Sequence, residues 1–145
     1  MKLLLDTSFI LELKRGNKLA QEALVRERDR ASEILVSLLS LYELYIGATY
    51  IWLKKGNTQE LIWLEEFVKW VSLCYPNKQA VEIASKIQAE AMLKGRKFPD
   101  IDLLIAVSAG TNTILLTADN DHLEMQEYLK KYGVEVRYIE KSGNV

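Results

Sequence analysis

The sequence predicts an α/β fold in which helices cover both faces of a central parallel sheet. Apolar runs at Leu3–Leu5 and Ile114–Leu116 have the length and composition of fully buried strands. Segments with apolar residues at helical spacing, such as Ala80–Ala91, separate these runs. Strands that alternate with helices are typical of parallel sheets, because each connection crosses from strand to strand through a helix.

Size and composition indicate one soluble globular domain. The chain has 145 residues, of which 49% are hydrophobic and 27% are charged. We expect a single domain over residues 1–141 and a disordered tail over residues 142–145. The net charge of −1 gives no global indication of nucleic-acid binding, so polyanions would need a local patch or a bound metal. One cysteine and one histidine exclude an intrachain disulfide and a closed zinc site, and no secretory signal is visible. We therefore expect a cytoplasmic protein.

The first half of the chain contains two expected strands and four expected helices. The elements follow from apolar spacing, capping residues and the glycines that end helices. They are a strand at 2–5, a helix from Ser8 that Gly16 ends, a charged helix at 18–28, a strand at 34–37, a helix capped by Ser40 that ends before Gly56, and a helix capped by Thr58 that runs to Trp70. The last two helices form an antiparallel hairpin through Gly56-Asn57.

The second half repeats the alternation. A short extended piece at 71–75 precedes a long amphipathic helix that Asn77 caps and that runs to about Leu93. The elements after the basic loop at 94–97 are a helix from Asp102 to Gly110, a strand at 113–117, a helix from Asp121 to Tyr132 and a strand at 134–139.

The stretch from Ile34 to Leu53 is long and apolar enough to need a membrane test. It contains one charged residue, Glu43, which would lie near the middle of the bilayer at a high free-energy cost. We therefore interpret the stretch as a strand followed by a helix and expect no membrane partner.

Four acidic residues are expected to gather in one pocket. Asp6 and Asp119 directly follow two buried strands, and ligands bind at the carboxyl edge of open parallel sheets. Asp102 begins a helix, and Glu43 lies in an otherwise apolar helix with no basic residue beside it. Each aspartate could simply cap a helix. Their joint placement instead favours a divalent metal, because crowded carboxylates need a cation between them.

These acids lie in four sequence blocks that resemble the PIN domain, a group of metal-dependent ribonucleases that includes the VapC toxins of toxin–antitoxin pairs. The blocks are Leu4–Ile10, Ser40–Leu44, Asp100–Ala109 and Leu116–Asp121. The resemblance covers nearly the whole chain. It implies a PIN-like three-layer α/β/α sandwich with a central parallel sheet and a protruding helical hairpin. The last block departs from the family pattern, because His122-Leu123 follows Asp121 where the family often has Phe.

The resemblance implies a Mg²⁺-dependent endoribonuclease, with Mn²⁺ as a possible replacement. Asp6, Glu43, Asp102 and Asp119 would be the catalytic metal ligands, with Asp121 as an outer partner and Asp100 ranked below them. Ser8 and Thr117 would bond a ligand carboxylate or a metal-bound water, although both residue types are also common at turns and strand ends. The residues proposed to hold RNA phosphates are Lys14, Arg15, Lys94, Arg96 and Lys97, each of which could also be a solvated surface charge. A two-histidine ribonuclease mechanism is excluded. His122 could lie near the site, but we expect it to face solvent.

An aromatic group on the predicted hairpin leaves two interpretations open. Trp63, Phe67 and Trp70 share one helical face, and further aromatics lie at positions 42, 45, 50 and 52. The stripe either packs into the core or forms a surface for partners. The resemblance implies a homodimer that binds an antitoxin, with an antitoxin arginine entering the acidic pocket.

Other functions are compatible with the same acids. A housekeeping PIN nuclease could process ribosomal RNA, and a structure-specific DNA nuclease could use a similar site. A PIN-like module could bind metal or protein without cutting. An aspartyl-phosphate enzyme is disfavoured, because such phosphatases usually place a second acid two residues after the nucleophile, where this chain has Ser8.

Overall fold

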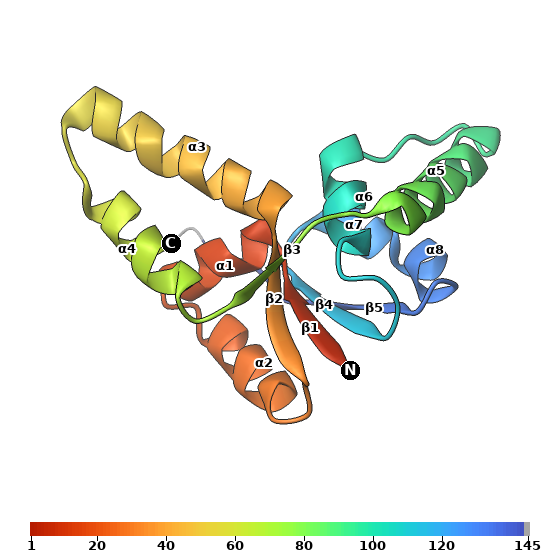
Figure 1. The fold of residues 1–145 in the computed structure, drawn as a ribbon, viewed down its shortest axis with the longest axis horizontal. Helices are drawn as coiled ribbons and strands as arrows, with labels where there is room; N and C mark the ends of the chain where they lie inside the picture. The colour runs from red at the N-terminus through yellow and green to blue at the C-terminus, as the bar shows by residue number, and fades with distance from the viewer. Residues whose placement is uncertain (144–145) are drawn as a thin grey trace.

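A five-stranded sheet runs through the centre of the computed structural model, which describes residues 1–143 (Figure 1). The strands are β1 (Lys2–Leu5), β2 (Glu33–Ser37), β3 (Ser72–Cys74), β4 (Thr113–Thr117) and β5 (Val134–Tyr138). Their order is β3-β2-β1-β4-β5, and every neighbouring pair is parallel. The most apolar expected strand, β1, is therefore central, which agrees with its burial on both faces.

Helices cover both faces of this sheet, which confirms the predicted three-layer α/β/α architecture. One layer contains α1 (Thr7–Lys14), α2 (Lys18–Arg28), α3 (Leu38–Lys55) and α4 (Gln59–Val68). The other contains α5 (Lys78–Leu93), α6 (Asp100–Val107), α7 (Asn120–Glu124) and α8 (Gln126–Lys130). Side chains of β1 alternate between the two cores, because Leu3 and Leu5 face the first layer and Leu4 faces the second.

The α3–α4 pair projects from the body of the molecule as the expected hairpin (Figure 1). Gly56 ends α3 in the left-handed conformation, with φ of 67°, and its N–H donates to the Trp52 carbonyl at 2.8 Å. The stretch tested for membrane insertion is thus split between β2 and α3. Over residues 1–143, no helix is both long and apolar enough to span a bilayer.

Several element boundaries differ from the predicted ones. Ser37 rather than Ser40 caps α3, through a 3.2 Å bond from the Leu39 N–H to its hydroxyl. Ser40 is buried inside the helix, and its hydroxyl has no partner among residues 1–143. Helix α6 begins at Asp100, two residues earlier than predicted.

The single helix expected over residues 121–132 is two short helices. Met125 separates α7 from α8, and its N–H is shared between the carbonyls of Asp121 and His122. The Met125 side chain is fully buried in the core against the second helical layer. Neither glycine nor proline lies at the break.

The aromatic stripe divides between the core and the surface. Trp63 and Phe67 stack with ring centroids 5.1 Å apart and pack against the core, whereas Trp70 is 81% exposed. Trp52, Tyr42 and Tyr50 are also exposed. Neither interpretation therefore holds for the whole stripe.

Part of the expected tail is held against the domain. The backbone N–H and the hydroxyl of Ser142 both donate to Glu12 on α1, at 2.6 and 2.8 Å. Residues 144 and 145 lie outside the described residues.

Candidate metal centre

Asp6 and Asp119 lie side by side because they follow neighbouring parallel strands. The register pairs Leu5 with Leu116, and the Asp6 N–H donates to the Leu116 carbonyl at 3.0 Å. Each aspartate then caps the helix that follows it, since Asp6 accepts from the Ser8 N–H and Asp119 accepts from the Asp121 N–H. The capping role and the role in the pocket are therefore compatible at both positions.

The structure places the hydroxyls of Ser8 and Thr117 on one oxygen of Asp6. Ser8 Oγ lies 2.6 Å and Thr117 Oγ1 lies 3.0 Å from Asp6 Oδ2. Ser8 Oγ also accepts from the Ala118 N–H at 2.9 Å, so it connects α1 to the loop after β4. Asp6 itself is 2% exposed. These bonds fix its carboxylate through Oδ2, and Oδ1 has no hydrogen-bond partner among residues 1–143.

Two groups of potential metal ligands meet at this edge of the sheet and share Asp119. The first is Asp6, Asp119 and His122, and the second is Asp102, Asp119 and Asp121. Within each group the ligand atoms lie within 4.8 Å of one another. The structure therefore brings together three of the four predicted catalytic acids, and Asp121 with them.

Glu43, the fourth predicted acid, lies outside both groups. Its Oε1 accepts a 2.7 Å hydrogen bond from the hydroxyl of Thr7, the residue next to Asp6. The side chain is half-buried on α3, and its partner is a hydroxyl rather than a cation. Asp100 is exposed and accepts from Gln88 at 3.1 Å, away from both ligand groups.

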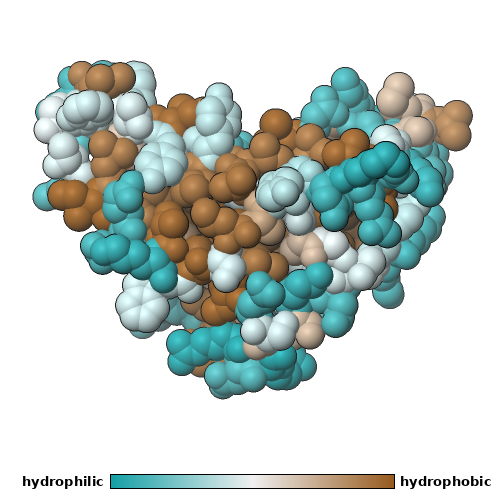
Figure 2. Space-filling model, viewed as in Figure 1, coloured by the Kyte–Doolittle hydropathy of each residue, from teal (hydrophilic) through white to brown (hydrophobic). Residues whose placement is uncertain are grey.

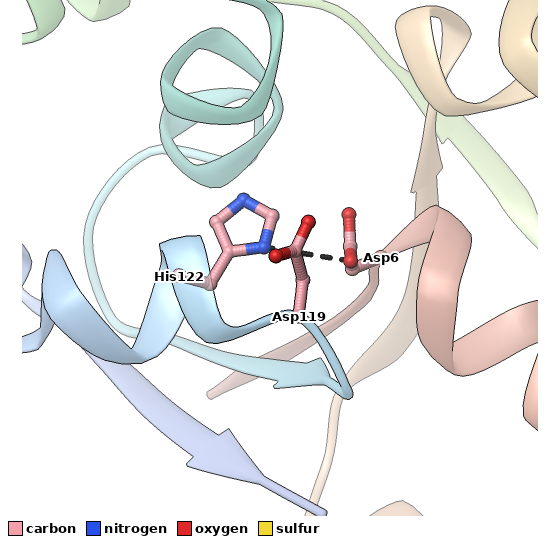
Figure 3. Close-up of side chains that lie close together, drawn as sticks. All are labelled: Asp6, Asp119 and His122. Atoms are coloured by element: carbon pink, nitrogen blue, oxygen red, sulfur yellow. Dashed lines mark ion pairs between the residues drawn. The ribbon is translucent and has the colours of Figure 1, made fainter. Parts of the chain in front are cut away.

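The expectation that His122 faces solvent is wrong, because its side chain is 0% exposed. Its Nε2 lies 2.7 Å from the Asp102 backbone carbonyl, and its Nδ1 lies 3.1 Å from Thr117 Oγ1. Figure 3 shows the ring directed toward Asp6 and Asp119, with Nδ1 3.4 Å from Asp6 Oδ2. The sequence does contain a signal for this position. His122 lies three residues after the cap Asp119, and residues at that spacing share one side of a helix, so His122 could be expected on the side of α7 that faces the acids.

Burial and charge shift the pKa values of the central residues in different directions. Burial opposes ionisation of Asp6, but the hydrogen bond and charge of His122 and the hydroxyls of Ser8 and Thr117 hold its pKa below the usual value. Burial alone would lower the pKa of His122, but Asp6 and the Asp102 carbonyl raise it to about 9. The pKa of Asp102 rises to about 6, because burial and the nearby charges of Asp119, Asp6 and Asp121 outweigh the attraction of His122. The carboxylates therefore repel one another in the absence of a further cation.

The donor set fits a divalent metal ion. Carboxylate oxygens converge from the residues that directly follow β1 and β4, from α6 and from α7, and Asp102, Asp119 and Asp121 retain partial exposure that gives access from solvent. A hard cation bound among them would offset the repulsion that raises the pKa of Asp102.

The predicted phosphate-binding residues form two sets. Lys14 pairs with Glu60 and Arg15 pairs with the buried Glu12, so both are already engaged with acids. Lys94, Arg96 and Lys97 lie in the exposed loop that leads to α6. Of these, Arg96 makes a 3.4 Å ion pair with Glu124, and Lys94 lies 5.5 Å from the centre of the Tyr128 ring.

Solved structures of similar shape include several VapBC proteins. VapBC2 from Rickettsia felis, bound to a promoter DNA fragment, has a TM-score of 0.72 at 18% identity, covering 95% of this chain and 98% of that chain. VapBC-1 from nontypeable Haemophilus influenzae has a TM-score of 0.71 at 22% identity, with the same coverage of 95% and 98%. VapBC-5 from Mycobacterium tuberculosis, a member of the VapBC family of toxin–antitoxin systems, has a TM-score of 0.64 at 23% identity, again covering 95% and 98%. At these identities the likeness shows a shared fold.

The family assignment comes from the sequence match. No curated protein sequence matches the chain. The PIN domain profile matches residues 3–128, which run from within β1 to within α8 and include all the acids of both ligand groups. The chain therefore belongs to the PIN-domain family.

Proposed function

We propose that the protein is a divalent-metal-dependent endoribonuclease and the toxin of a toxin–antitoxin pair. One observation carries the proposal, namely the two ligand groups that share Asp119 at the carboxyl edge of β1 and β4. Membership of the PIN-domain family and the shared fold with VapBC structures support it. The proposed ion is Mg²⁺, with Mn²⁺ as a replacement.

The chain's own residues would position the ion and the substrate. Asp6, Asp102 and Asp119 would hold the metal, with Asp121 as a further ligand and Glu43 beside it. When bound, such a metal makes water a usable nucleophile at neutral pH and stabilises charge on phosphate oxygens. Ser8 and Thr117 hold the Asp6 carboxylate in place through their 2.6 and 3.0 Å bonds. The exposed cations Lys94, Arg96 and Lys97 would contact RNA phosphates near the start of α6.

The test is cleavage of RNA by the purified protein in the presence of Mg²⁺ or Mn²⁺. Asp6→Asn and Asp102→Asn should each lose activity while remaining folded. Asp100→Asn is the matched control, because Asp100 lies on the same helix as Asp102 but outside both ligand groups. Full activity of both Asp6→Asn and Asp102→Asn would refute the proposal. Parallel assays on tRNA, ribosomal RNA and flap DNA would separate a toxin from a ribosomal RNA-processing enzyme and from a DNA nuclease, and absence of cleavage in all three would favour a binding module.

An apolar groove beside the site supports an antitoxin as partner. The groove has a volume of about 450 Å³ and is lined by Leu11, Leu44, Ala48, Ile51, Trp63 and Leu64, with Glu43 and Thr7 also on its wall. Figure 2 shows apolar side chains gathered over this side of the molecule, where α1, α3 and α4 meet. An amphipathic antitoxin segment could place apolar residues in the groove and a basic residue near the acids.

Gly47 gives a direct test of this partner. It lines the groove, and a Cβ built on it meets no heavy atom within 4 Å. Gly47→Trp should fill the groove and block capture of the antitoxin encoded beside the toxin gene, whereas Gly47→Ala should not. Equal binding by both variants would place the partner elsewhere.

We also propose that the protein forms a homodimer. Val81 and Met92 on α5 and Ile101 on α6 are exposed apolar residues, and a hollow of about 520 Å³ lies between these two helices. Size-exclusion chromatography with light scattering should give twice the monomer mass. A monomer at micromolar concentration would contradict the proposal.

A further inference from the structure

We propose that Nδ1 of His122 is a metal ligand, so that the centre is a mixed nitrogen–oxygen site that selects a first-row transition ion over Mg²⁺. The inference rests on the proposed metal-dependent function and specifies which ion the centre takes. It concerns a residue that belongs to the first ligand group together with Asp6 and Asp119. His122 is the only histidine in the chain, so a nitrogen ligand from imidazole can come from no other residue.

The hydrogen bond at the far side of the ring fixes the tautomer. Nε2 lies 2.7 Å from the backbone carbonyl of Asp102, and a carbonyl oxygen can only accept. Nε2 therefore carries a proton. In the neutral ring the lone pair then belongs to Nδ1, which is the atom that faces the carboxylates.

This arrangement is the one that metal-binding histidines use. A ligating imidazole almost always donates its other N–H to a backbone carbonyl or a carboxylate, which sets the ring orientation and makes the ligating nitrogen more basic. Here the carbonyl belongs to Asp102, whose own carboxylate is in the second ligand group. The residue that orients the ring is therefore itself part of the metal centre.

The two oxygen atoms nearest Nδ1, Thr117 Oγ1 and Asp6 Oδ2, each have other hydrogen-bond partners. Nδ1 lies 3.1 Å from Thr117 Oγ1 and 3.4 Å from Asp6 Oδ2, and the ring is directed at the space beside Asp119 (Figure 3). The Thr117 hydroxyl has one hydrogen, which it donates to Asp6 Oδ2 at 3.0 Å, and its oxygen accepts from the Asp119 N–H at 3.0 Å. Nδ1 can thus turn from the hydroxyl to a metal ion without leaving a buried hydroxyl unpaired.

A nitrogen ligand changes which cation the site prefers. Mg²⁺ takes oxygen ligands and retains several waters, so imidazole adds little to its affinity. Imidazole suits later transition ions, whose affinity for nitrogen-containing sites rises from Mn²⁺ through Co²⁺. Only an unprotonated nitrogen can ligate, so the ion takes the place of any proton on Nδ1.

The first experiment reads the ligand directly, without a substitution. The full-length protein is loaded with Mn²⁺, and pulsed electron paramagnetic resonance records nuclear modulation from nitrogen bound to the ion. We expect the modulation of a coordinated imidazole nitrogen, and we expect its frequencies to change when only histidine is labelled with ¹⁵N.

The second experiment measures selectivity by titration calorimetry with Co²⁺ and Mg²⁺. His122→Gln is the matched variant, because a glutamine amide can still donate to the Asp102 carbonyl while the Nδ1 position is lost. Co²⁺ affinity should fall by at least about tenfold, the scale on which even the outer partners of metal ligands act. Mg²⁺ affinity should change far less, and circular dichroism should show that the variant is folded.

The outcomes separate this inference from the proposed function. Mn²⁺ binding without imidazole nitrogen modulation overturns the inference and leaves an all-carboxylate nuclease centre intact. Equal loss of Co²⁺ and Mg²⁺ affinity in His122→Gln also overturns it, because the ring would then only position the carboxylates. Failure of every divalent ion to bind the wild-type protein overturns both the inference and the proposed function.

Discussion

The hydroxyl of Thr7 donates a 2.7 Å hydrogen bond to the carboxylate of Glu43 and so joins the start of α1 to the first half of α3. Thr7 follows Asp6 directly, so the bond brings Glu43 to the border of the metal centre without placing it in either ligand group. Glu43 is therefore connected to the site by its hydrogen bond with the Thr7 hydroxyl on α1.

Replacing Thr7 should weaken metal binding without unfolding the protein. Thr7→Val keeps the shape of the side chain but removes the donor that orients Glu43. We expect metal affinity to fall by no more than roughly tenfold, the lower end of the effect of losing an outer partner of a ligand, because Glu43 borders the centre but belongs to neither ligand group. Stability should fall by about 1 kcal/mol for the lost hydrogen bond. Calorimetric titration with Mn²⁺ measures the first effect, and Thr7→Ser should behave like the wild type in both measurements.

The buried carboxylate of Glu12 should make stability depend on pH in the acid range. Burial opposes its ionisation, but donors from Ser142, Asn17 and Arg15 lower its pKa from 4.5 to about 2. A lowered pKa means that the unfolded chain binds the proton more tightly, so the stabilisation is complete above about pH 4.5 and is lost as the pH falls toward 2. The difference corresponds to an unfolding free energy on the order of 3 kcal/mol. Urea unfolding of Glu12→Gln across this range should show a flatter pH profile than the wild type.

A methyl group at Gly47 should stabilise the protein. Gly47 lies inside α3, and a Cβ there meets no heavy atom within 4 Å. Alanine restricts the unfolded chain and should add about 0.5–1 kcal/mol. Gly56→Ala is the contrasting variant, because its φ of 67° strains any residue with a Cβ and stability should fall. A lower melting temperature for Gly47→Ala would mean that α3 does not tolerate the methyl group at this position.

Two aromatic residues at the end of the hairpin should differ in their contribution to stability. Phe67 stacks on Trp63 and contacts the core, so Phe67→Ala should cost about 2 kcal/mol. Trp70 is 81% exposed, and Trp70→Ala should change the unfolding free energy by no more than about 0.5 kcal/mol. Equal losses would show that Trp70 is covered in solution, as a dimer or partner interface would require.

Most elements of the fold could be predicted because their sequence signals are local. The strands β1 and β4 are continuous apolar runs, and α2 has the predicted bounds, 18–28. The cap of α5 by Asn77 is also confirmed, with a 2.9 Å bond from the Ala80 N–H. In each case the residues that determine the element lie within a few positions of one another.

The parts that were missed depend on contacts between distant segments. The break between α7 and α8 lies at Met125, whose side chain is buried in the core. No neighbouring glycine or proline predicts a break at this position. His122 is buried because its ring meets the carbonyl of Asp102, twenty positions earlier in the sequence. Alternation and capping rules place Asp6, Asp102 and Asp119 at helix starts, but they do not predict the direction of the His122 ring on α7. The bond from Thr7 to Glu43 likewise depends on the packing of α1 against α3.

The attachment of Ser142 to Glu12 determines where a fusion tag can be added. Ser142 lies against α1 at Glu12, within one turn of the groove residues Leu11 and Lys14, so an insertion beside Ser142 would crowd the groove. Met1 lies at the opposite end of the sheet, where its carbonyl accepts from Ser32. Affinity handles and fluorescent labels placed before Met1 should therefore leave the groove accessible.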